Sequence, residues 1–155
     1  MAKQSAGMLM FRRKHGRLEV LLVHPGGPFW ANKDDGAWSI PKGEYAADED
    51  PREAAKREFK EETGLDAAGP LLELTAIRQS AKDVKAWAFE GDCDPAAVTS
   101  NTFSMEWPPR SGRRQAFPEV DRAAWFEIEE AKRKILKGQA GFLLDLTSKL
   151  GLGSC

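Results

Sequence analysis

The sequence lacks several features that would place it in a specialised class of protein. It has only 2 cysteines in 155 residues, Cys93 and Cys155, and these form neither a metal-spaced pair nor a disulfide framework. No run of about 18 apolar residues, the length that crosses a bilayer, is present. The apolar stretch before Arg12 is too short for a secretory signal. We therefore expect a cytoplasmic protein with no membrane partner.

An excess of one charge is also missing. The 23 basic residues nearly balance 24 acidic ones, for a formal net charge of -1, so no overall field favours nucleic acid or a membrane surface as the partner. Hydrophobic residues make up 41% of the chain, which allows a core without disulfides or oligomerisation. We expect one domain over residues 1–155, with any electrostatic specialisation confined to a local site.

Apolar patterning predicts an alternation of strands and helices. Two apolar runs, residues 7–13 and 18–24, flank a turn at 14–17 and predict a hairpin. His15 falls in this turn and His24 at a strand end, so neither is expected to take part in catalysis. The same patterns predict strands at residues 71–77, 84–90 and 123–128 and helices at residues 129–136 and 139–150.

Three stretches between these elements predict loops. Residues 25–36 are rich in glycine, proline, asparagine and aspartate, and they place Phe29 and Trp30 where a ligand would meet them. Residues 43–50 are rich in small residues and in acidic residues, and they predict a second loop. Residues 92–122 are mostly irregular in composition, and a loop of this length in a compact domain is usually functional. We expect it to border the active site.

The clearest helix is predicted at residues 51–63. Asp50 suits the N-cap, Pro51 suits the first helical position, and Glu53 follows three residues after the cap. Gly64 stands where a C-terminal glycine belongs. Local signals therefore predict both ends of this helix.

The helix carries three carboxylates on one face. Glu58, Glu61 and Glu62 are spaced by three and four residues, and like charges at such spacings cost an isolated helix about 0.2–0.5 kcal/mol per pair. A divalent cation would turn this repulsion into binding, and oxygen-only ligands favour Mg²⁺, with Mn²⁺ as a substitute, over zinc. Ala54 and Ala55 leave space beside the carboxylates. The alternative is a solvated, salt-bridged helix face.

The stretch from Gly43 to Leu65 resembles the Nudix box, G-x5-E-x7-R-E-U-x-E-E-x-G-U, in which U is a bulky apolar residue. The matching residues are Gly43, Glu49, Arg57, Glu58, Phe59, Glu61, Glu62, Gly64 and Leu65. The order of strands, box and C-terminal helix also resembles this family. The resemblance implies an α/β fold, an α/β/α sandwich with a central mixed β-sheet and a loop-helix-loop catalytic motif.

The resemblance also implies roles for the box residues. Glu58 and Glu62 would be the principal metal ligands. Glu61 would be a further ligand, directly or through water, or a catalytic group. The carbonyl of Gly43 is a candidate extra ligand, and Arg57 would orient the glutamates.

The general base stays open between the box and a later loop, because members of the family differ on this point. Glu119 is the loop candidate, since it lies six residues before Trp125 and resembles the loop glutamate that precedes the last sheet strand in some members. Glu106 is its competitor. Glu49 would support the turn before the helix.

Two features outside the box bear on the substrate. Residues 36–44, GAWSIPKGE, resemble the lead-in of Nudix enzymes that act on diadenosine or diphosphoinositol polyphosphates, so Trp38 and Lys42 are expected to contact the substrate. The long loop supplies cations for a polyphosphate and rings for stacking on a base; these are Arg110, Arg113, Arg114, Trp107 and Phe117. In the alternative, Trp107 anchors the loop and the arginines keep it soluble.

The leading hypothesis is metal-dependent hydrolysis of a diphosphate linkage in a nucleoside polyphosphate, with dinucleoside polyphosphates ahead of nucleoside triphosphates. Nucleotide sugars such as ADP-ribose and inositol pyrophosphates are the alternatives within the enzyme class. A sensor that binds a nucleotide without turnover is the alternative of another class, although no box glutamate is missing. RNA-end hydrolysis would call for a broad basic surface, so the expected partner is a small nucleotide. A homodimer is compatible with the sequence.

Overall fold

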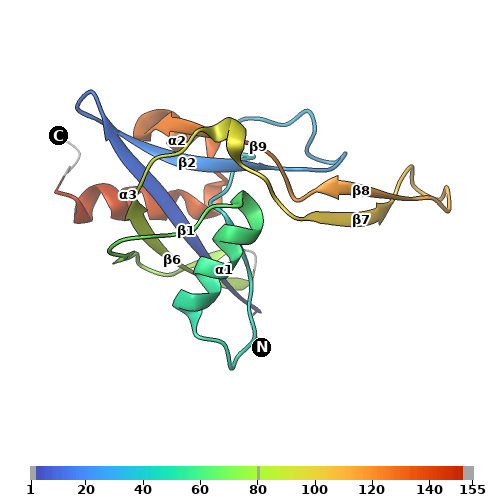
Figure 1. Cartoon of the computed structure of the whole chain (residues 1–155), viewed down its shortest axis with the longest axis horizontal. Helices are drawn as coiled ribbons and strands as arrows, with labels where there is room; N and C mark the ends of the chain where they lie inside the picture. Colours follow the sequence, from blue (N-terminus) through green and yellow to red (C-terminus); the bar gives the residue numbers. More distant parts are fainter. Residues whose placement is uncertain (1–2, 80, 152–155) are drawn as a thin grey trace.

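The computed structural model describes residues 3–79 and 81–151, and it is built around one mixed β-sheet (Figure 1). Its strands are β1 (Lys3–Lys14), β2 (Arg17–Pro25), β3 (Lys42–Glu44), β4 (Leu72–Glu73), β5 (Ile77–Gln79), β6 (Lys82–Glu90) and β9 (Val120–Glu127). The main order is β4-β6-β1-β2-β9, with β3 paired to β1 and β5 paired to β6. β1 runs parallel to β6 and antiparallel to β2 and β3. The prediction for Cys155 lies outside the described residues.

Helices cover both faces of this sheet. α1 (Pro51–Thr63) packs on one face through Ala54, Ala55 and Phe59, together with Met8 and Met10 of β1. α2 (Ile128–Lys134) and α3 (Ala140–Lys149) cover the other face. The second core includes Leu9, Val84, Ile135, Phe142 and Leu146. The α/β/α sandwich with a mixed sheet is therefore confirmed.

α1 begins and ends where its sequence signals place it. The carboxylate of Asp50 accepts a hydrogen bond from the backbone N–H of Glu53 at 3.3 Å. Gly64 adopts φ 78°, and its N–H donates to the carbonyl of Lys60 at 2.7 Å. A side chain would be strained at this φ. The helix that carries the box glutamates is thus fixed at both ends.

The prediction that residues 92–122 are mostly irregular was wrong. This stretch contains a short 3₁₀ turn, η1 (Pro95–Ala97), and a two-stranded hairpin, β7 (Thr102–Glu106) and β8 (Arg114–Pro118), that projects from the body (Figure 1). Most hairpin side chains are exposed, so the sequence shows little of the apolar alternation that reveals a half-buried strand. One strand prediction and one loop prediction also needed correction. Residues 71–77 form two separate strands, β4 and β5, and the expected loop at 43–50 begins inside β3.

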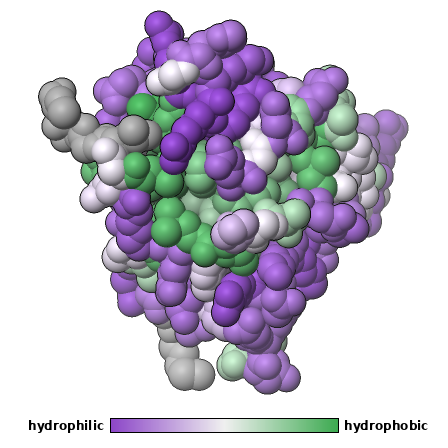
Figure 2. Space-filling view, turned by 60° about the vertical axis from the view of Figure 1, so that its left-hand side comes forward, coloured by the Kyte–Doolittle hydropathy of each residue, from purple (hydrophilic) through white to green (hydrophobic). Residues whose placement is uncertain are grey.

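The surface has an apolar groove at the sheet edge near the end of α3. The groove has a volume of about 320 Å³ and includes Phe11, Leu71, Leu72 and Leu150 in its lining. Figure 2, which brings the side with the end of α3 forward, shows apolar atoms reaching the surface among hydrophilic ones. Among residues 3–79 and 81–151, no helix is long and apolar enough to cross a membrane.

Candidate active site

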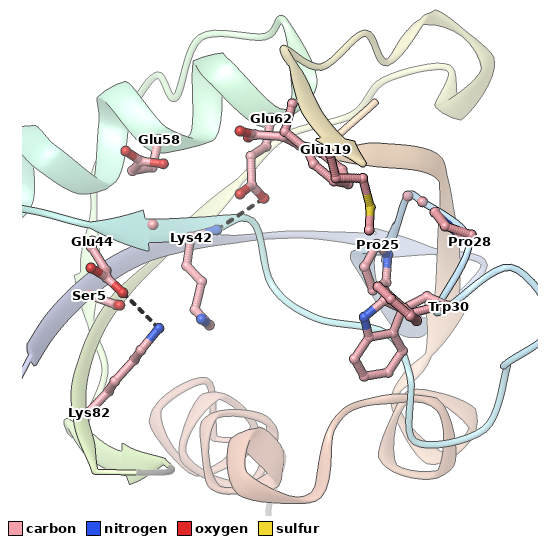
Figure 3. A pocket seen from close by; sticks show the side chains of 16 residues that line it. Ser5, Pro25, Pro28, Trp30, Lys42, Glu44, Glu58, Glu62, Lys82 and Glu119 are labelled. Carbon is pink, nitrogen blue, oxygen red and sulfur yellow. Dashed lines mark hydrogen bonds and ion pairs between the residues drawn. The ribbon is translucent and has the colours of Figure 1, made fainter. Parts of the chain in front are cut away.

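A cavity of about 780 Å³ lies where α1, β3, the 25–36 loop and the β7–β8 hairpin meet (Figure 3). α1 contributes Glu58 and Glu62, and β3 contributes all three of its residues. Further walls come from the loop, the hairpin and the residue after it, and these include Phe29, Trp30, Phe103, Met105 and Glu119. β1 and β6 contribute Ser5 and Lys82. The long segment after β6 therefore borders the site, as the sequence predicts.

Gly43 and Glu58 fit together closely. A Cβ atom at Gly43 would overlap with the Oε1 atom of Glu58, so a larger residue would displace this carboxylate. Gly43 pairs with Ala6 of β1, whose side chain packs in the α1 core. The side of Gly43 that lacks a Cβ thus faces the helix. The first glycine of the box provides space for a carboxylate.

Arg57 contacts the three acidic residues around it. Its Nε and Nη2 atoms donate to the two oxygens of Glu49 at 2.9 and 3.0 Å. Nη1 donates to Glu58 at 2.6 Å and lies 3.4 Å from Glu61. The bidentate contact with Glu49 raises the pKa of Arg57 and gives its guanidinium a fixed orientation. This is the geometry that an arginine orienting the glutamates requires.

The carboxylates that face the cavity have unfavourable surroundings for their negative charge. Burial, together with the charges of Glu119 and Glu58, raises the pKa of Glu62 to about 8, although the backbone N–H of Lys42, which donates to Glu62 at 3.3 Å, acts in the opposite direction. Burial and the charge of Glu61 raise the pKa of Glu58 and of Glu119. A cation placed between such groups relieves their desolvation and their mutual repulsion.

The donor set fits an open magnesium site better than a closed cage. In the part of the chain that the structure describes, no three histidine, cysteine, aspartate or glutamate side chains form a ready-made metal cluster. Mg²⁺ commonly uses one or two protein carboxylates and completes its octahedron with waters and substrate phosphates. Glu58 and Glu62 both line the cavity and supply hard oxygen ligands of this kind.

Glu119 reaches the cavity from a position that backbone contacts fix on two sides. Its N–H donates to the carbonyl of Asn101 at 2.8 Å, and its carbonyl accepts from Gly26 at 3.0 Å. The N–H of Asn101 in turn donates to the carbonyl of Glu61 at 2.9 Å. The residue between β8 and β9 is therefore tied both to α1 and to the 25–36 loop.

Glu106, the other loop candidate for the base, is used within the hairpin. Its carboxylate accepts hydrogen bonds from the backbone N–H groups of Arg110 and Gly112 at 3.1 and 3.0 Å. It closes the turn between β7 and β8 and does not line the cavity. Its geometry argues against a catalytic role.

The arginines of the hairpin also lie outside the cavity lining. Arg110 and Arg113 belong to the turn between β7 and β8, and Arg114 begins β8. The guanidinium of Arg114 donates to the hydroxyl and the carbonyl of Ser104 across the hairpin at 3.2 and 3.1 Å. The structure does not bring these predicted phosphate contacts to the carboxylates.

The aromatic rings predicted to stack on a base form a second layer behind the cavity wall. Trp107 packs edge-on against Phe29, with ring centroids 5.7 Å apart, and Phe117 packs on Phe103 at 5.9 Å. Phe29 and Phe103 line the cavity, whereas Trp107 and Phe117 do not. The placement of Trp107 favours the alternative in which this ring anchors the long loop.

Trp38 and His24 lie in the core. Trp38 is 4% exposed, and its Nε1 atom donates to Asp34 at 2.8 Å. The expected substrate contact of Trp38 is therefore not supported. His24 is fully buried, with its ring nitrogens 2.8 Å from Asp121 and 2.6 Å from the carbonyl of Lys33. Through Lys33 and Asp34, His24 and Trp38 attach the end of the 25–36 loop to the core.

Among the polar residues that line the cavity, sequence reasoning did not single out Ser5, Glu44 and Lys82. Lys82 forms an ion pair with Glu44 at 2.9 Å. Burial lowers the pKa of Lys42, and the charge of Lys82 is the next largest cause. The only sequence signal was an alternation of charged residues with apolar ones at strand ends, which is common on solvated strands.

The fold and the site define a class of protein, an α/β/α sandwich with a glutamate-rich helix at the edge of its mixed sheet. Residues 1–146 match the model of the NUDIX domain. The chain belongs to the NUDIX domain family.

Curated relatives share only parts of their length with this chain. An RNA pyrophosphohydrolase of Gluconacetobacter diazotrophicus is 51% identical over 43 residues, which cover 28% of this chain and 23% of that protein. An octanoyltransferase of Myxococcus xanthus is 31% identical over 100 residues, 64% of this chain and 25% of that protein. The chain thus spans about a quarter of the length of these two relatives.

Solved structures match over nearly the whole chain. The crystal structure of a C. elegans Ap4A hydrolase binary complex superposes with a TM-score of 0.65 and 23% identity, covering 96% of this chain and 98% of that one. At this identity the likeness concerns the fold.

Proposed function

We propose that this protein is a magnesium-dependent Nudix hydrolase that cleaves a diphosphate linkage in a nucleoside polyphosphate, with dinucleoside polyphosphates as the preferred class. One observation carries the proposal. Glu58 and Glu62 of α1 face the same cavity as Glu119 and Lys42, which come from other elements. Carboxylates that hold a cation and an ammonium group that meets a phosphate are what hydrolysis of a phosphoanhydride requires. Mn²⁺ would substitute for Mg²⁺.

The box residues would hold the metal. Glu58 and Glu62 are the ligands that face the cavity, and Arg57 keeps Glu58 in place through a 2.6 Å hydrogen bond. Bound magnesium would polarise the phosphoryl oxygens and lower the pKa of the attacking water. Glu61 lies beside Arg57 and is not among the residues that line the cavity, which suits a ligand acting through water better than a direct one.

Glu119 is the general base that the geometry supports best. It lines the cavity opposite α1, and burial raises its pKa above that of an ordinary glutamate. A base works best when its pKa lies near the operating pH. In this role Glu119 takes the proton of the attacking water, while Lys42 donates to an oxygen of the phosphate chain.

A smaller apolar recess supports a nucleotide as the substrate. It has a volume of about 230 Å³ and shares Lys42, Glu62 and Glu119 with the main cavity. Its walls also include Trp30, which lines both cavities, and Leu136. A planar base suits such a recess, since aromatic and aliphatic side chains supply flat apolar contact area. Two similar proteins, an RNA pyrophosphohydrolase and an Ap4A hydrolase, support a phosphoanhydride as the substrate and differ in the nucleotide attached.

A phosphate-release screen tests this proposal. The substrates are nucleoside triphosphates, diadenosine polyphosphates, ADP-ribose, nucleotide sugars and inositol pyrophosphates, each with magnesium and with EDTA. Glu62→Gln serves as the inactive variant, and Glu53→Gln, an exposed carboxylate on the same helix, is the matched control. We expect turnover of diadenosine polyphosphates that EDTA and Glu62→Gln abolish and Glu53→Gln leaves intact.

Two outcomes would contradict the proposal. If nucleotides bind without turnover in the presence of magnesium, the protein is a sensor. If ADP-ribose, a nucleotide sugar or an inositol pyrophosphate is the preferred substrate, the hydrolase assignment stands and the proposed substrate class is wrong.

A further inference from the structure

The side chains of β3 divide the cavity into an acidic and a basic part. Gly43 pairs with Ala6 and faces the helix that carries Glu58. Its neighbours Lys42 and Glu44 point to the opposite face of the sheet, because successive residues of a strand alternate. Figure 3 shows the ammonium group of Lys42 on the side of β3 away from α1. The cavity therefore extends around β3 from one face of the sheet to the other.

Three residues join Lys42 on this second face. Glu44 pairs with Ser5 of β1, and Ser5 pairs with Val84 of β6. Lys82 lies two residues before Val84, so its side chain is on the same face. Figure 3 shows Glu44 and Lys82 next to each other beside Ser5. Three adjacent strands thus deliver two cations and a hydroxyl to one place.

Ser5 has a buried hydroxyl group without a hydrogen-bond partner among the described residues. It is 1% exposed and lines the cavity. A buried hydroxyl without a partner costs roughly 1–3 kcal/mol, and such groups are rare in folded proteins. A ligand that accepts a hydrogen bond from the Ser5 hydroxyl would recover this free energy.

The two lysines are the natural complement of that hydroxyl. Lys82 is 35% exposed and is held by Glu44, whose own side chain is 50% exposed. Lys42 is close enough for the charge of Lys82 to contribute to its lowered pKa. Glu44 is the counter-charge of both ammonium groups on this face, while Glu62 and Glu58 act on Lys42 from the side of α1. Phosphate oxygens would add negative charge between the two lysines and accept hydrogen bonds from them.

We propose that Ser5, Lys42 and Lys82 form an anion subsite for a phosphate group beyond the linkage that is cleaved. Until that phosphate binds, Lys82 stays in its ion pair with Glu44. The incoming phosphate accepts hydrogen bonds from the Ser5 hydroxyl and both ammonium groups, and Glu44 moves into solvent. The subsite selects ligands with long phosphate chains. Its part in substrate choice rests on the proposed hydrolase function, whereas its affinity for phosphate does not.

Binding of inorganic tripolyphosphate, measured by isothermal titration calorimetry in the presence of EDTA, tests the subsite without turnover. Lys82→Gln should weaken binding about tenfold, because it removes a charge-assisted hydrogen bond. Ser5→Ala should weaken it about threefold, since it removes a neutral donor. Glu44→Gln should strengthen it about threefold, because it removes the competing carboxylate. The matched control is Lys85→Gln, a lysine of the same strand on the α1 face, and it should leave binding unchanged.

Equal affinities for wild type, Lys82→Gln and Glu44→Gln would overturn the proposal. So would weaker binding in Glu44→Gln, which would assign Glu44 to positioning Lys82. Circular dichroism and thermal unfolding of each variant separate a lost contact from a lost fold.

Turnover measurements then distinguish a failure of the subsite proposal from a failure of the proposed function. If the protein hydrolyses diadenosine tetraphosphate, Lys82→Gln should raise its KM about tenfold at constant kcat and leave the KM for ADP-ribose unchanged. An equal rise in KM for both substrates would show that the subsite does not discriminate between substrates by the length of the phosphate chain. If no substrate is hydrolysed but the affinity for tripolyphosphate still depends on Lys82, the proposed function is wrong and the subsite proposal stands.

Discussion

α1 and the β7–β8 hairpin both border the active-site cavity, and they are built in opposite ways. α1 is capped at both ends by local contacts, and Phe59 and two alanines bury it on the sheet. The hairpin projects from the body with most side chains exposed, and an isolated two-stranded hairpin is marginally stable in water. Phe103 at Gly27 and Trp107 on Phe29 connect it to the 25–36 loop. The proposed metal ligands thus lie on a helix that is capped and packed on the sheet, while a loosely supported element shapes the entrance.

The largest contrast between the two regions should come from removing one carboxylate in each. Glu62→Gln should lower kcat by about a thousandfold or more, because it removes a proposed ligand of the cation that would polarise the phosphate. Glu106→Gln should change kcat by less than about twofold, since Glu106 only closes the hairpin turn and the amide oxygen still accepts a hydrogen bond. Steady-state kinetics with magnesium compares the two. A large loss of kcat in Glu106→Gln would return this residue to the list of candidate bases.

Gly43→Ala tests whether the fit between β3 and α1 sets the rate. The added methyl group displaces Glu58, and a misplacement of about 1 Å costs about a hundredfold in rate. Gly141→Ala is the matched control, because a Cβ there makes an ordinary contact at 3.6 Å with Ile77 and an alanine favours the helix. Activity and thermal unfolding are measured together. Full activity in Gly43→Ala would show that the Glu58 position is adjustable.

The metal-free protein should lose stability as the pH rises, through Glu62. Its pKa in the folded protein is about 8, against an ordinary value of 4.5. The folded state therefore holds a proton that the unfolded state has released between these two pH values, and folding becomes less favourable across this window. Glu62→Gln should gain about 2 kcal/mol over wild type between pH 5 and pH 8.

Denaturant unfolding in EDTA at several pH values measures this difference. Adding magnesium at pH 8 should stabilise wild type and leave Glu62→Gln unchanged, because the ionised carboxylate binds the cation. Parallel stability curves for the two proteins would show that Glu62 has an ordinary pKa.

Trp107→Ala should have the smallest effect, confined to the entrance. It removes the edge-on contact with Phe29, worth about 1 kcal/mol, so the KM should rise about threefold with kcat unchanged. The melting temperature should fall by no more than about 2–4 °C, the shift that about 1 kcal/mol produces in a domain of this size. A loss of kcat as large as that of Gly43→Ala would show that the hairpin positions the reacting groups.

The sequence predicted the parts of the molecule that neighbouring residues determine. The bounds of α1 follow from Asp50, Pro51 and Gly64, and the β1–β2 hairpin follows from two apolar runs around a short turn. The spacing placed Glu58 and Glu62 on one helix face, and the resemblance to the Nudix box implied that Gly43 lies near them, although Gly43 was expected in a loop and lies in β3. These features need no knowledge of distant contacts.

The parts that the sequence did not predict depend on which strands become neighbours. Ser5 and Lys82 meet at the cavity because β1 pairs with β6, and no local pattern shows this pairing. Trp38 was expected at the substrate because of a motif, but the packing of α2 and the loop buries its ring. The β7–β8 hairpin was missed because its exposure on both faces removes the alternation of apolar residues.

The parallel pairing of β1 with β6 also dictates the order in which the chain can assemble. β1 is the centre of the sheet, and its partner β6 begins at Lys82, with Lys3 opposite it. Contacts so distant in sequence require closure of a long loop before they stabilise anything, which slows folding. During synthesis β1 and β2 can pair early, but the full sheet must wait for β6 and β9. An apolar hairpin would then be exposed on the ribosome for many seconds, and chaperones would be the natural protection for it.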